Sequence, residues 1–531
     1  MTLFLQILVV EASLITISLC TYGAWAVSFV QAESGEALCY RWRKEFDKGR
    51  HSETSPSETK LRGTWVSHRC EVRPGPEFLL RKYHFYDDGS FRLEQFLYLD
   101  DSCIVPTYGL EAWGRLRLTR PSWVVPGGTE AEPSLHRLHV VPYSTDVAQR
   151  IAHRVNRTCP GQVTGAWRPY RKYRIFSYVE GKAKDNVVLE DISCASRLHF
   201  SVNELQLIRV VHRRTTQFHR ESRTPTVELY LGDIHTNHQR RLTYQPTSYQ
   251  LPLLEPNTPG CHTCHLVAKS ADQSPPQLPP KPKLPVYLSG EWLSTRCEVR
   301  PLGLFLTRLL RYYTANNSWQ GEYQYFRDPN CIRPWFLLRA QGLYSHVGPS
   351  MKLHGATNYN FKLLRAQVVP QDPGISNNLN AAAEDGRCAG PWHVNQSRDV
   401  SATGGCSLLG LAVPSIKYDV VKMEVDIYGN ALLFLGDVDT DGEATLQNHR
   451  PTSYQVPLIQ CKTFSDLVSD KVTYNLPRAQ LMAITTDSCS RMEVSWLSLV
   501  ALLGCVIYVW TIWLVRKIIP GGMSVPDPLS H

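Results

Sequence analysis

The stretch GTWVSHRCEVRP at Gly63–Pro74 returns almost unchanged as GEWLSTRCEVRP at Gly290–Pro301. The same offset, lengthened by one residue, aligns Cys103 with Cys331 farther along the chain. Agreement of this kind over a long stretch of sequence indicates a duplication. The quoted motif therefore marks the beginning of two related units.

The second half of each unit is looser but still recognisable. Leu231–Ile234 resembles Leu435–Val438, and Pro246–Gln250 returns as Pro451–Gln455. A unit of this length far exceeds the period of about 20–50 residues that is typical of solenoid repeats. The repeat therefore predicts two copies of one domain in tandem.

The pattern inside the units is mostly typical of strands. Apolar residues occupy both alternating registers between Phe91 and Tyr98, which indicates strands buried on both faces. One helix is expected in each unit, at Asp146–Val155 with Thr145 as its cap, and at Ile375–Ala383. We therefore predict a mainly β fold, with two homologous antiparallel domains that are each a barrel or a sandwich with a minor helix.

The N-terminal end carries a membrane-targeting signal. Residues 1–32 are mostly apolar and end in small residues, which predicts a signal peptide. An uncleaved N-terminal anchor is the alternative, because Glu11 interrupts the apolar run and no Lys or Arg precedes it.

The C-terminal end predicts one transmembrane helix. Val494–Val515 contains no charge and is long enough to cross a hydrocarbon core of about 30 Å. Arg516 and Lys517 follow directly, which places the tail in the cytoplasm and predicts a single-pass type I protein of the plasma membrane. The expected segments are a signal peptide at 1–32, an N-terminal segment at 33–62, the first β-domain at 63–265, a stiff Pro-rich linker at 266–286, the second β-domain at 287–461, a stalk at 462–493, the transmembrane helix at 494–515 and a cytoplasmic tail at 516–531.

Cysteines and glycosylation sequons both suit the secretory pathway. Twelve of the 15 cysteines run from Cys39 to Cys461, an even set that is typical of disulfides in an oxidising compartment. The economical hypothesis pairs, within each unit, Cys70 with Cys103, Cys159 with Cys194, Cys297 with Cys331, and Cys388 with Cys406. The remaining four, Cys39, Cys261, Cys264 and Cys461, would close the rest of the structure. Three sequons, at Asn156, Asn316 and Asn395, are candidate glycosylation sites.

Three motifs allow both a functional and a structural interpretation. The CHTCH stretch at Cys261–His265 resembles a haem-attachment or zinc pattern, but a structural disulfide is favoured. Asp437–Gly442 resembles the start of a calcium loop, but Asn448 occupies the last ligand position, which favours an acidic turn. Glu71 with Arg73, like its counterpart in the second unit, could be a catalytic pair, but a buried ion pair is favoured.

The composition restricts the class of function. The chain is 43% hydrophobic and 20% charged, which suits sizeable cores, and its net charge is only +9. Basic runs such as Arg171–Arg174 fit a solvated strand face, or else a weak patch for anionic glycans or lipid headgroups. We expect no nucleic-acid partner, because no dense basic face on a known module is present. Nucleophile, phosphate-loop and dinucleotide motifs are absent from the sequence, so we expect a binding protein without cofactor or metal rather than an enzyme.

The motif Trp-x-Ser-x-x-Cys-Glu-Val-Arg-Pro, present twice, resembles the adenomatosis polyposis coli down-regulated proteins, a family of membrane-bound Wnt inhibitors. Further matches cover nearly the whole predicted ectodomain, among them Gly127–Ala131, Asn156–Gly161, Glu204–Arg209 and Leu231–Thr236. The resemblance implies a β-barrel-like domain present twice. It also implies inhibition of Wnt signalling at the cell surface through Wnt ligands and their LDL-receptor-related co-receptors.

The implied fold suggests how a Wnt ligand could be held. Wnt proteins carry a fatty-acyl chain, and a closed sheet of about eight strands can enclose one small apolar ligand. We expect an apolar pocket for this lipid in one or both units, with candidate lining residues Tyr83, Phe85, Phe91, Phe96 and Tyr98 and with ordinary core packing as the alternative. A lipid-binding protein unrelated to Wnt and an adhesion or co-receptor module remain alternatives, and the sequence leaves open whether the chain forms a homodimer.

Overall fold

The computed structural model describes residues 61–161, 163–177, 195, 197–213, 216–217, 220–221, 226–426, 429–443 and 446–463. The chain divides into two compact units, Met1–Asp466 and Leu467–His531, and all described residues lie in the first. The signal peptide, most of the stalk, the predicted transmembrane helix and the tail lie outside the described residues. Among the residues that are described, no helix combines the length and apolar character needed to cross a membrane.

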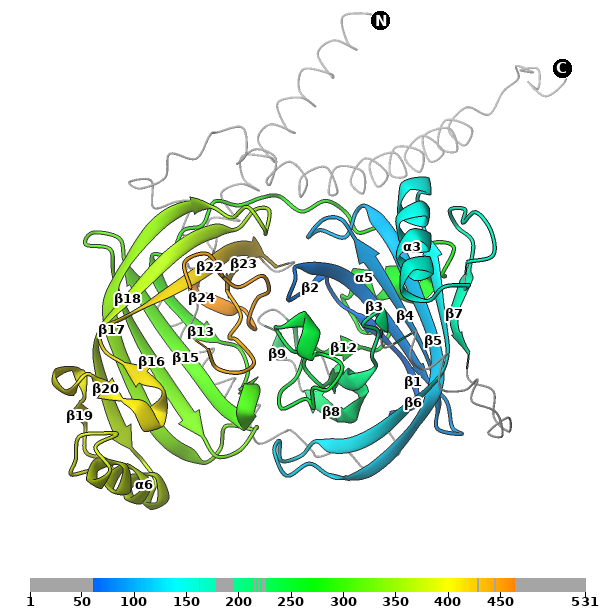
Figure 1. The fold of residues 1–531 in the computed structure, drawn as a ribbon. Helices are drawn as coiled ribbons and strands as arrows, with labels where there is room; N and C mark the ends of the chain where they lie inside the picture. Colours follow the sequence, from blue (N-terminus) through cyan, green and yellow to red (C-terminus); the bar gives the residue numbers. More distant parts are fainter. Residues whose placement is uncertain are drawn as a thin grey trace, which may run out of the picture. The chain divides into compact units, whose positions relative to one another are not determined.

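The first repeat closes into a ring of antiparallel strands (Figure 1). Closure comes from β1, which pairs with β12 on one side and with β3 on the other. The ring strands are β1 (Gly63–Ser67), β3 (Glu77–Phe85), β4 (Ser90–Tyr98), β5 (Pro106–Pro121), β6 (Thr129–Pro142), β8 (Leu207–Arg213), β11 (Thr226–Leu231) and β12 (Leu253–Leu254). Outside the ring lie β2 (Glu71–Arg73), β7 (Tyr173–Ser177), β9 (Thr216–Gln217) and β10 (Arg220–Glu221).

The ring of the second repeat has the same topology. Here β13 pairs with both β24 and β15, which closes the second ring. The ring strands are β13 (Gly290–Ser294), β15 (Leu304–Tyr313), β16 (Ser318–Phe326), β17 (Pro334–Pro349), β18 (Thr357–Pro370), β22 (Ser415–Val425), β23 (Asn430–Leu435) and β24 (Leu458–Thr463). The others are β14 (Glu298–Arg300), β19 (Arg398–Asp399), β20 (Gly405–Cys406) and β21 (Leu411–Ala412). Of the two alternatives left by the sequence, the barrel describes each repeat.

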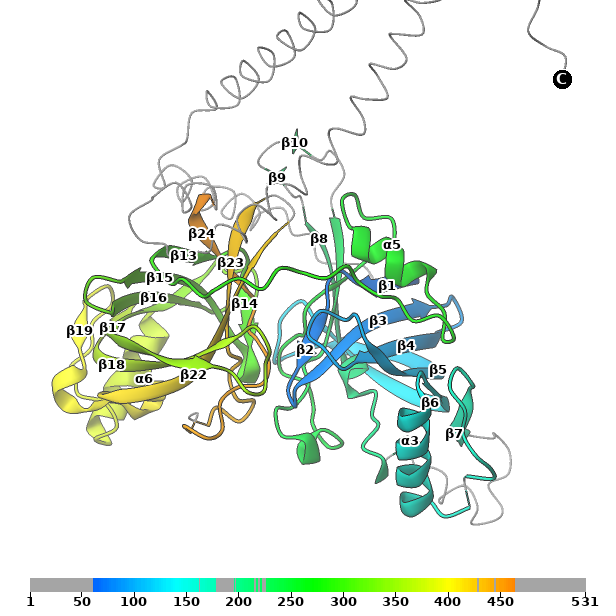
Figure 2. The same cartoon turned by 90° about the horizontal axis from the view of Figure 1, so that it is seen from above.

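Both expected helices are present. α3 (Thr145–Thr158) lies beside β6, and α6 (Pro373–Glu384) is its counterpart in the second repeat (Figure 2). The prediction that Thr145 caps α3 is wrong: Thr145 is the first helical residue, and the Ser144 hydroxyl accepts the hydrogen bond from the Val147 N–H. A third helix, α5 (His262–Lys269), was not predicted. Short 3-10 turns occur at Asn203–Gln206, His238–Arg240, Pro301–Gly303, Ser401–Thr403 and Ser407–Leu409.

The repeated motif builds the same buried cluster in both barrels. In the first, Glu71 accepts hydrogen bonds from the Ser67 hydroxyl at 2.5 Å and from Arg81 Nε at 3.0 Å. In the second, Glu298 accepts the matching bonds from Ser294 at 2.6 Å and from Arg308 Nε at 2.8 Å. The guanidinium is held inside the barrel wall because its charge is paired with the buried carboxylate.

The predicted Glu71–Arg73 pair needs correction. Glu71 pairs with Arg81 instead, while Arg73 donates to Gln250 at 2.9 Å and lies 3.7 Å from Glu204. The equivalent pair does form in the second repeat, where Arg300 lies 2.5 Å from Glu298. The spacing Glu-x-Arg puts both side chains on one face of a strand. The sequence could not show that an arginine from the next strand would form the ion pair with this carboxylate instead.

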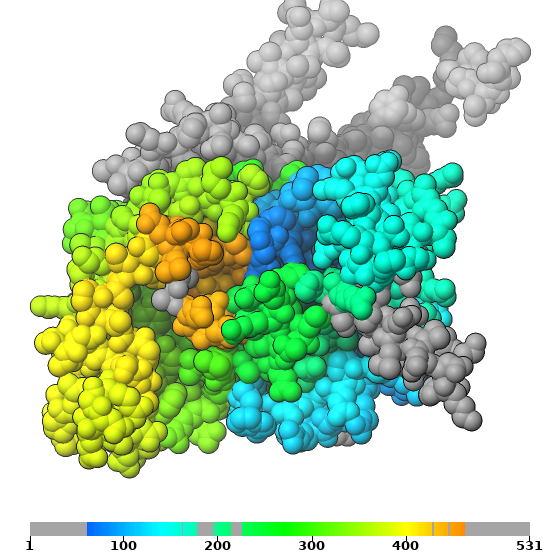
Figure 3. Space-filling model, viewed as in Figure 1, coloured from blue at the N-terminus to red at the C-terminus, as the bar shows by residue number. Residues whose placement is uncertain are grey.

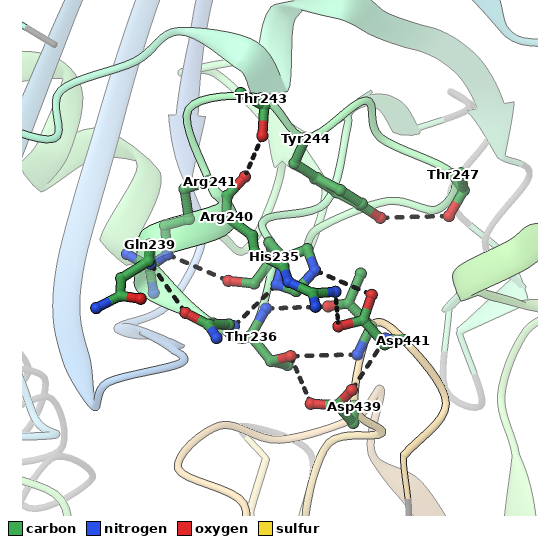
Figure 4. A network of polar contacts seen from close by, with 12 residues as sticks. His235, Thr236, Gln239, Arg240, Arg241, Thr243, Tyr244, Thr247, Asp439 and Asp441 are labelled. Atoms are coloured by element: carbon green, nitrogen blue, oxygen red, sulfur yellow. Dashed lines mark hydrogen bonds and ion pairs between the residues drawn. The ribbon is translucent and has the colours of Figure 1, made fainter.

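The two repeats contact each other through equivalent residues. The Thr236 N–H donates to the Thr440 hydroxyl at 3.0 Å, and the Thr440 N–H donates back to the Thr236 hydroxyl at 3.2 Å (Figure 4). Each threonine stands three residues after the aspartate of its Leu-Gly-Asp motif. A residue that meets its own equivalent in this reciprocal way is the mark of a two-fold relation, here between two halves of one chain.

Further contacts obey the same relation. The N–H groups of Gly75 and Leu302, which are equivalent, donate to the hydroxyls of Thr452 and Thr247 at 2.8 and 2.9 Å. In the space-filling view, the green loop after β11 lies against the orange loop after β23 (Figure 3). The interface is therefore self-complementary.

The hairpins that follow β5 and β17 also insert reciprocally. Val125, at the first hairpin, is fully buried in a cluster of the second repeat, and its equivalent Leu353 is fully buried in a cluster of the first. Their partners are Phe305, Phe326 and Cys331 for Val125, and Phe78, Tyr98 and Cys103 for Leu353.

Two ion pairs flank this apolar contact. Arg69 lies 2.6 Å from Glu424, and the equivalent Arg296 lies 3.4 Å from Glu228. Burial opposes ionisation of Glu228, but the charges of Arg213 and Arg296 outweigh it and lower the pKa of its carboxyl to about 2. Burial also opposes ionisation of Glu424, whose pKa neighbouring cations likewise hold well below its usual value.

We expect the double substitution Arg69→Ala and Arg296→Ala to lower the free energy of unfolding by about 1.5–3 kcal/mol for each ion pair that it removes. Because the pKa values of both carboxyls are depressed in the folded protein, this stabilisation is present above about pH 5 and disappears as the pH falls toward 2. Urea unfolding of variant and parent between these pH values measures the difference.

Arg339→Ala with Arg365→Ala is the matched control, because both of these arginines are exposed on the second barrel. If the difference in unfolding free energy between the Arg69→Ala, Arg296→Ala variant and the parent stayed constant or grew on acidification, it would not come from these two ion pairs.

Candidate functional site

A cavity of about 280 Å³ opens inside the first barrel. Its walls are apolar on the side of β5 and β6, with residues such as Leu110 and Leu138, but polar groups line the remainder. Arg73, Glu204 and His235 are among them. This mixed lining suits a small polar molecule better than a hydrocarbon chain.

A polar cluster occupies the interior of this barrel. The Tyr83 hydroxyl donates to Glu204 Oε1 at 2.9 Å, and the Gln95 amide donates to both groups at 3.1 Å. Tyr83 is completely buried, and burial raises the pKa of its hydroxyl, so the group stays a neutral donor. The Tyr83 side chain therefore fills space that the equivalent position of the second barrel leaves open.

The second barrel holds a larger cavity of about 370 Å³. Leucine replaces tyrosine at Leu310, the equivalent of Tyr83, and Gly321 stands where the first barrel has Leu93. A methyl group added at Gly321 would lie 2.7 Å from the ring of Tyr323 and 3.0 Å from Leu310. Leu310 is therefore the smaller side chain that borders this cavity, whereas Tyr323 and Leu310 fill the space beside Gly321.

Apolar side chains predominate in the lining of the second cavity, although charged residues such as Arg308, Lys417 and Asp419 are also part of it. Leu306, Leu338 and Phe361 form much of its wall. Burial raises the pKa of Tyr323 to about 12, so its hydroxyl is uncharged at neutral pH. Within the described part of the chain, the buried Nε1–H of Trp319 has no hydrogen-bond partner. The site could therefore hold part of a hydrocarbon chain.

The five residues predicted to line an apolar pocket do not line the first cavity. Tyr83, Phe85 and Phe91 pack in the core of the barrel. Phe96 and Tyr98 lie on the opposite face of β4, in a cluster that includes residues of α5 and the linker, and the Tyr98 hydroxyl contacts the Pro276 carbonyl. The five side chains lie in two separate buried clusters, because the pleat sends alternate residues of one strand to opposite faces.

The equivalents of the first three do line the second cavity. Leu310, Tyr312 and Trp319 correspond to Tyr83, Phe85 and Phe91 and are all part of its wall. The reasoning from sequence allowed a pocket in one or both units but named candidate residues only in the first. Aligning the repeats residue by residue would have shown the smaller side chains at Leu310 and Gly321.

The structure joins several of the predicted cysteine pairs. Disulfides link Cys70 to Cys103, Cys297 to Cys331, and Cys388 to Cys406. Cys261 is bonded to Cys264 at the start of α5, which excludes free thiolate ligands in the CHTCH motif. Cys159 and Cys461 are also disulfide-bonded, whereas Cys39 and Cys194 lie outside the described residues.

The other candidate residues are placed as follows. Asn156, Asn316 and Asn395 are all exposed, as an attached glycan requires. The acidic turn contacts the first repeat, where Asp439 accepts from the Thr236 hydroxyl at 2.7 Å and Asp441 lies 2.8 Å from Arg240 (Figure 4). No cluster of metal-ligating side chains occurs in the described ranges.

Comparison with known proteins identifies a family. The family model described as "Adenomatosis polyposis coli down-regulated 1" matches residues 39–279 and 282–466. Among solved structures, a point mutant of the vaccine antigen transferrin binding protein B from Haemophilus parasuis is similar at 6% sequence identity and a TM-score of 0.13. That match covers 72% of this chain and spans 65% of the other, and its low score carries no argument.

We expect Leu310→Tyr combined with Gly321→Leu to weaken binding of a fluorescent long-chain fatty acid by about tenfold or more, because each buried CH₂ contributes about 0.8 kcal/mol. Leu310→Tyr places a larger side chain on the cavity wall, and Gly321→Leu forces the contacting side chains of Tyr323 and residue 310, which line the cavity, to move. Fluorescence titration of the purified protein measures the affinity.

Leu343→Tyr is the control, because Leu343 lies on the outer face of the same barrel and is 45% exposed. Trp319→Phe tests the same cavity without filling it, should the double variant fold poorly. Unchanged affinity in the folded double variant would exclude this cavity as the lipid site.

Proposed function

The chain belongs to the adenomatosis polyposis coli down-regulated 1 family, and from this premise we propose that it is a cell-surface inhibitor of Wnt signalling. Membership fits a cell-surface role related to Wnt signalling. In our proposal the protein binds Wnt ligands and their LDL-receptor-related co-receptors and catalyses no reaction. The predicted membrane span would hold both barrels outside the plasma membrane, where disulfides persist.

The observation that carries the proposal is the apolar cavity of the second barrel. Its volume lies within the range of about 300–1,000 Å³ that is typical of small-molecule sites. An acyl chain that enters it leaves water, which favours binding. Sequestering the Wnt lipid would remove the group through which a Wnt ligand engages an apolar receptor surface.

Extracellular lipid binding without specificity for Wnt is the second candidate. The same cavity favours it, because an apolar lining selects for a hydrocarbon chain and not for the protein that carries the chain. Extraction and identification of lipids from the purified protein distinguishes the two, since a tightly retained free fatty acid would favour a carrier.

We expect the full-length protein to bind an acylated Wnt ligand at least about tenfold more tightly than the same ligand without its acyl chain, because the buried chain supplies much of the affinity. Surface plasmon resonance with both ligand forms measures this ratio, and a Wnt reporter assay tests inhibition. Leu343→Tyr should keep the preference, whereas Leu310→Tyr with Gly321→Leu should abolish it. Equal binding of both ligand forms would refute lipid sequestration.

A further inference from the structure

A cationic face covers the outer wall of the first barrel across β4, β5, β6 and β7, which lie side by side (Figure 2). We define it by Arg92, Arg137, Lys172 and Arg174 together with the ring of Trp113. Arg92 lies opposite Trp113 on the neighbouring strand, and Trp113 lies opposite Arg137 on the next. Since neighbouring strands are about 4.8 Å apart, the positive charges form a row across the sheet.

Buried carboxylates fix two of these cations. Arg92 lies 2.6 Å from Glu111, which is 1% exposed, and Lys172 contacts both Glu111 and Asp272. Because the carboxylates lie beneath the cations, they order the side chains without presenting negative charge to a ligand.

Trp113 is held in the middle of the row. The side-chain charges of Arg92, Arg137 and Lys172 lie 5.5, 5.6 and 5.6 Å from its ring centroid. His139 meets the ring edge-on at 5.4 Å between centroids. An aromatic ring surrounded by donors is a surface against which a sugar ring can pack while its charged substituents bind the neighbouring cations.

Arg137 and Arg174 supply the uncompensated charge. Both are exposed, and neither forms an ion pair with a carboxylate among the described residues. Burial, followed by the charges of Lys172, Arg137 and Arg174, lowers the pKa of His139 to about 4. A positive potential therefore acts across the face even though the protein as a whole is only moderately basic.

The second barrel shows that the fold does not require this face. Gln320, Gln341 and Gln367 replace Arg92, Trp113 and His139 at the equivalent register positions. Leu343 stands where the first barrel has Arg115, and the Arg137 position keeps an arginine, Arg365. The row of cations around an aromatic ring is specific to the first barrel.

We propose that the cationic face of the first barrel binds a sulfated glycosaminoglycan. Guanidinium groups bind sulfate through paired N–H donors, and a row of them suits a linear polyanion. A lipid bilayer fits less well, because no large apolar side chain within β4, β5, β6 or β7 is exposed for insertion. The proposal rests on the extracellular location given under the proposed function but not on lipid binding in the cavity.

The experiment measures binding of purified full-length protein to size-defined heparin oligosaccharides at physiological salt. Arg137→Glu with Arg174→Glu should weaken binding by roughly tenfold or more, because two attractive charges become repulsive ones. Arg339→Glu with Arg365→Glu makes the same change in net charge on the second barrel and should leave the affinity within about twofold of the parent. All four arginines are exposed, so thermal unfolding should not change by much.

Two further binding measurements identify the chemistry of the ligand. Fully desulfated heparin should not bind, and phosphatidylserine vesicles should bind no better than neutral vesicles. Equal weakening of heparin binding in both charge-reversal variants, or vesicle binding without heparin binding, would overturn the proposal. Fatty-acid binding measured on the same preparation separates this outcome from failure of the lipid site.

Discussion

Each barrel depends on the pairing that closes its ring, in which the first strand pairs with the second strand as well as with the last. In the first repeat, β1 lies between β12 and β3, so the ring has no free edge and its interior has a fixed circumference. This junction is stabilised by buried hydrogen bonds among Ser67, Glu71 and Arg81. The second repeat has the equivalent bonds among Ser294, Glu298 and Arg308. With the circumference fixed, the size of the inward side chains decides how much space remains.

This constraint explains how one fold supports two different interiors. Tyr83 with Glu204 and Gln95 fills the first ring with a satisfied polar cluster. In the second ring Leu310 replaces the tyrosine and borders a larger, mainly apolar cavity. The two copies of the fold therefore enclose cavities of different size and lining, and their outer walls differ as well.

The interface between the repeats uses the symmetry that duplication creates. Thr236 and Thr440 exchange hydrogen bonds, and Val125 and Leu353 insert into matching clusters. Such a surface is the one that a symmetric dimer of single domains would use, and here both halves lie in one chain. The acidic turn at Asp439 and Asp441, which resembles a calcium loop in sequence, is part of this contact.

The sequence alone determined the duplication, the β class, both helices and the family, because these depend on local periodicity and on motifs that occur twice. It also suggested the cysteine pairs that the structure joins, since equivalent positions imply equivalent neighbours. Only the tertiary structure decided which repeat has the larger cavity, that Phe96 faces away from the interior of the first barrel, and that Glu71 pairs with Arg81. Those outcomes depend on volume and distance between strands far apart in the chain, which no local pattern of residues records.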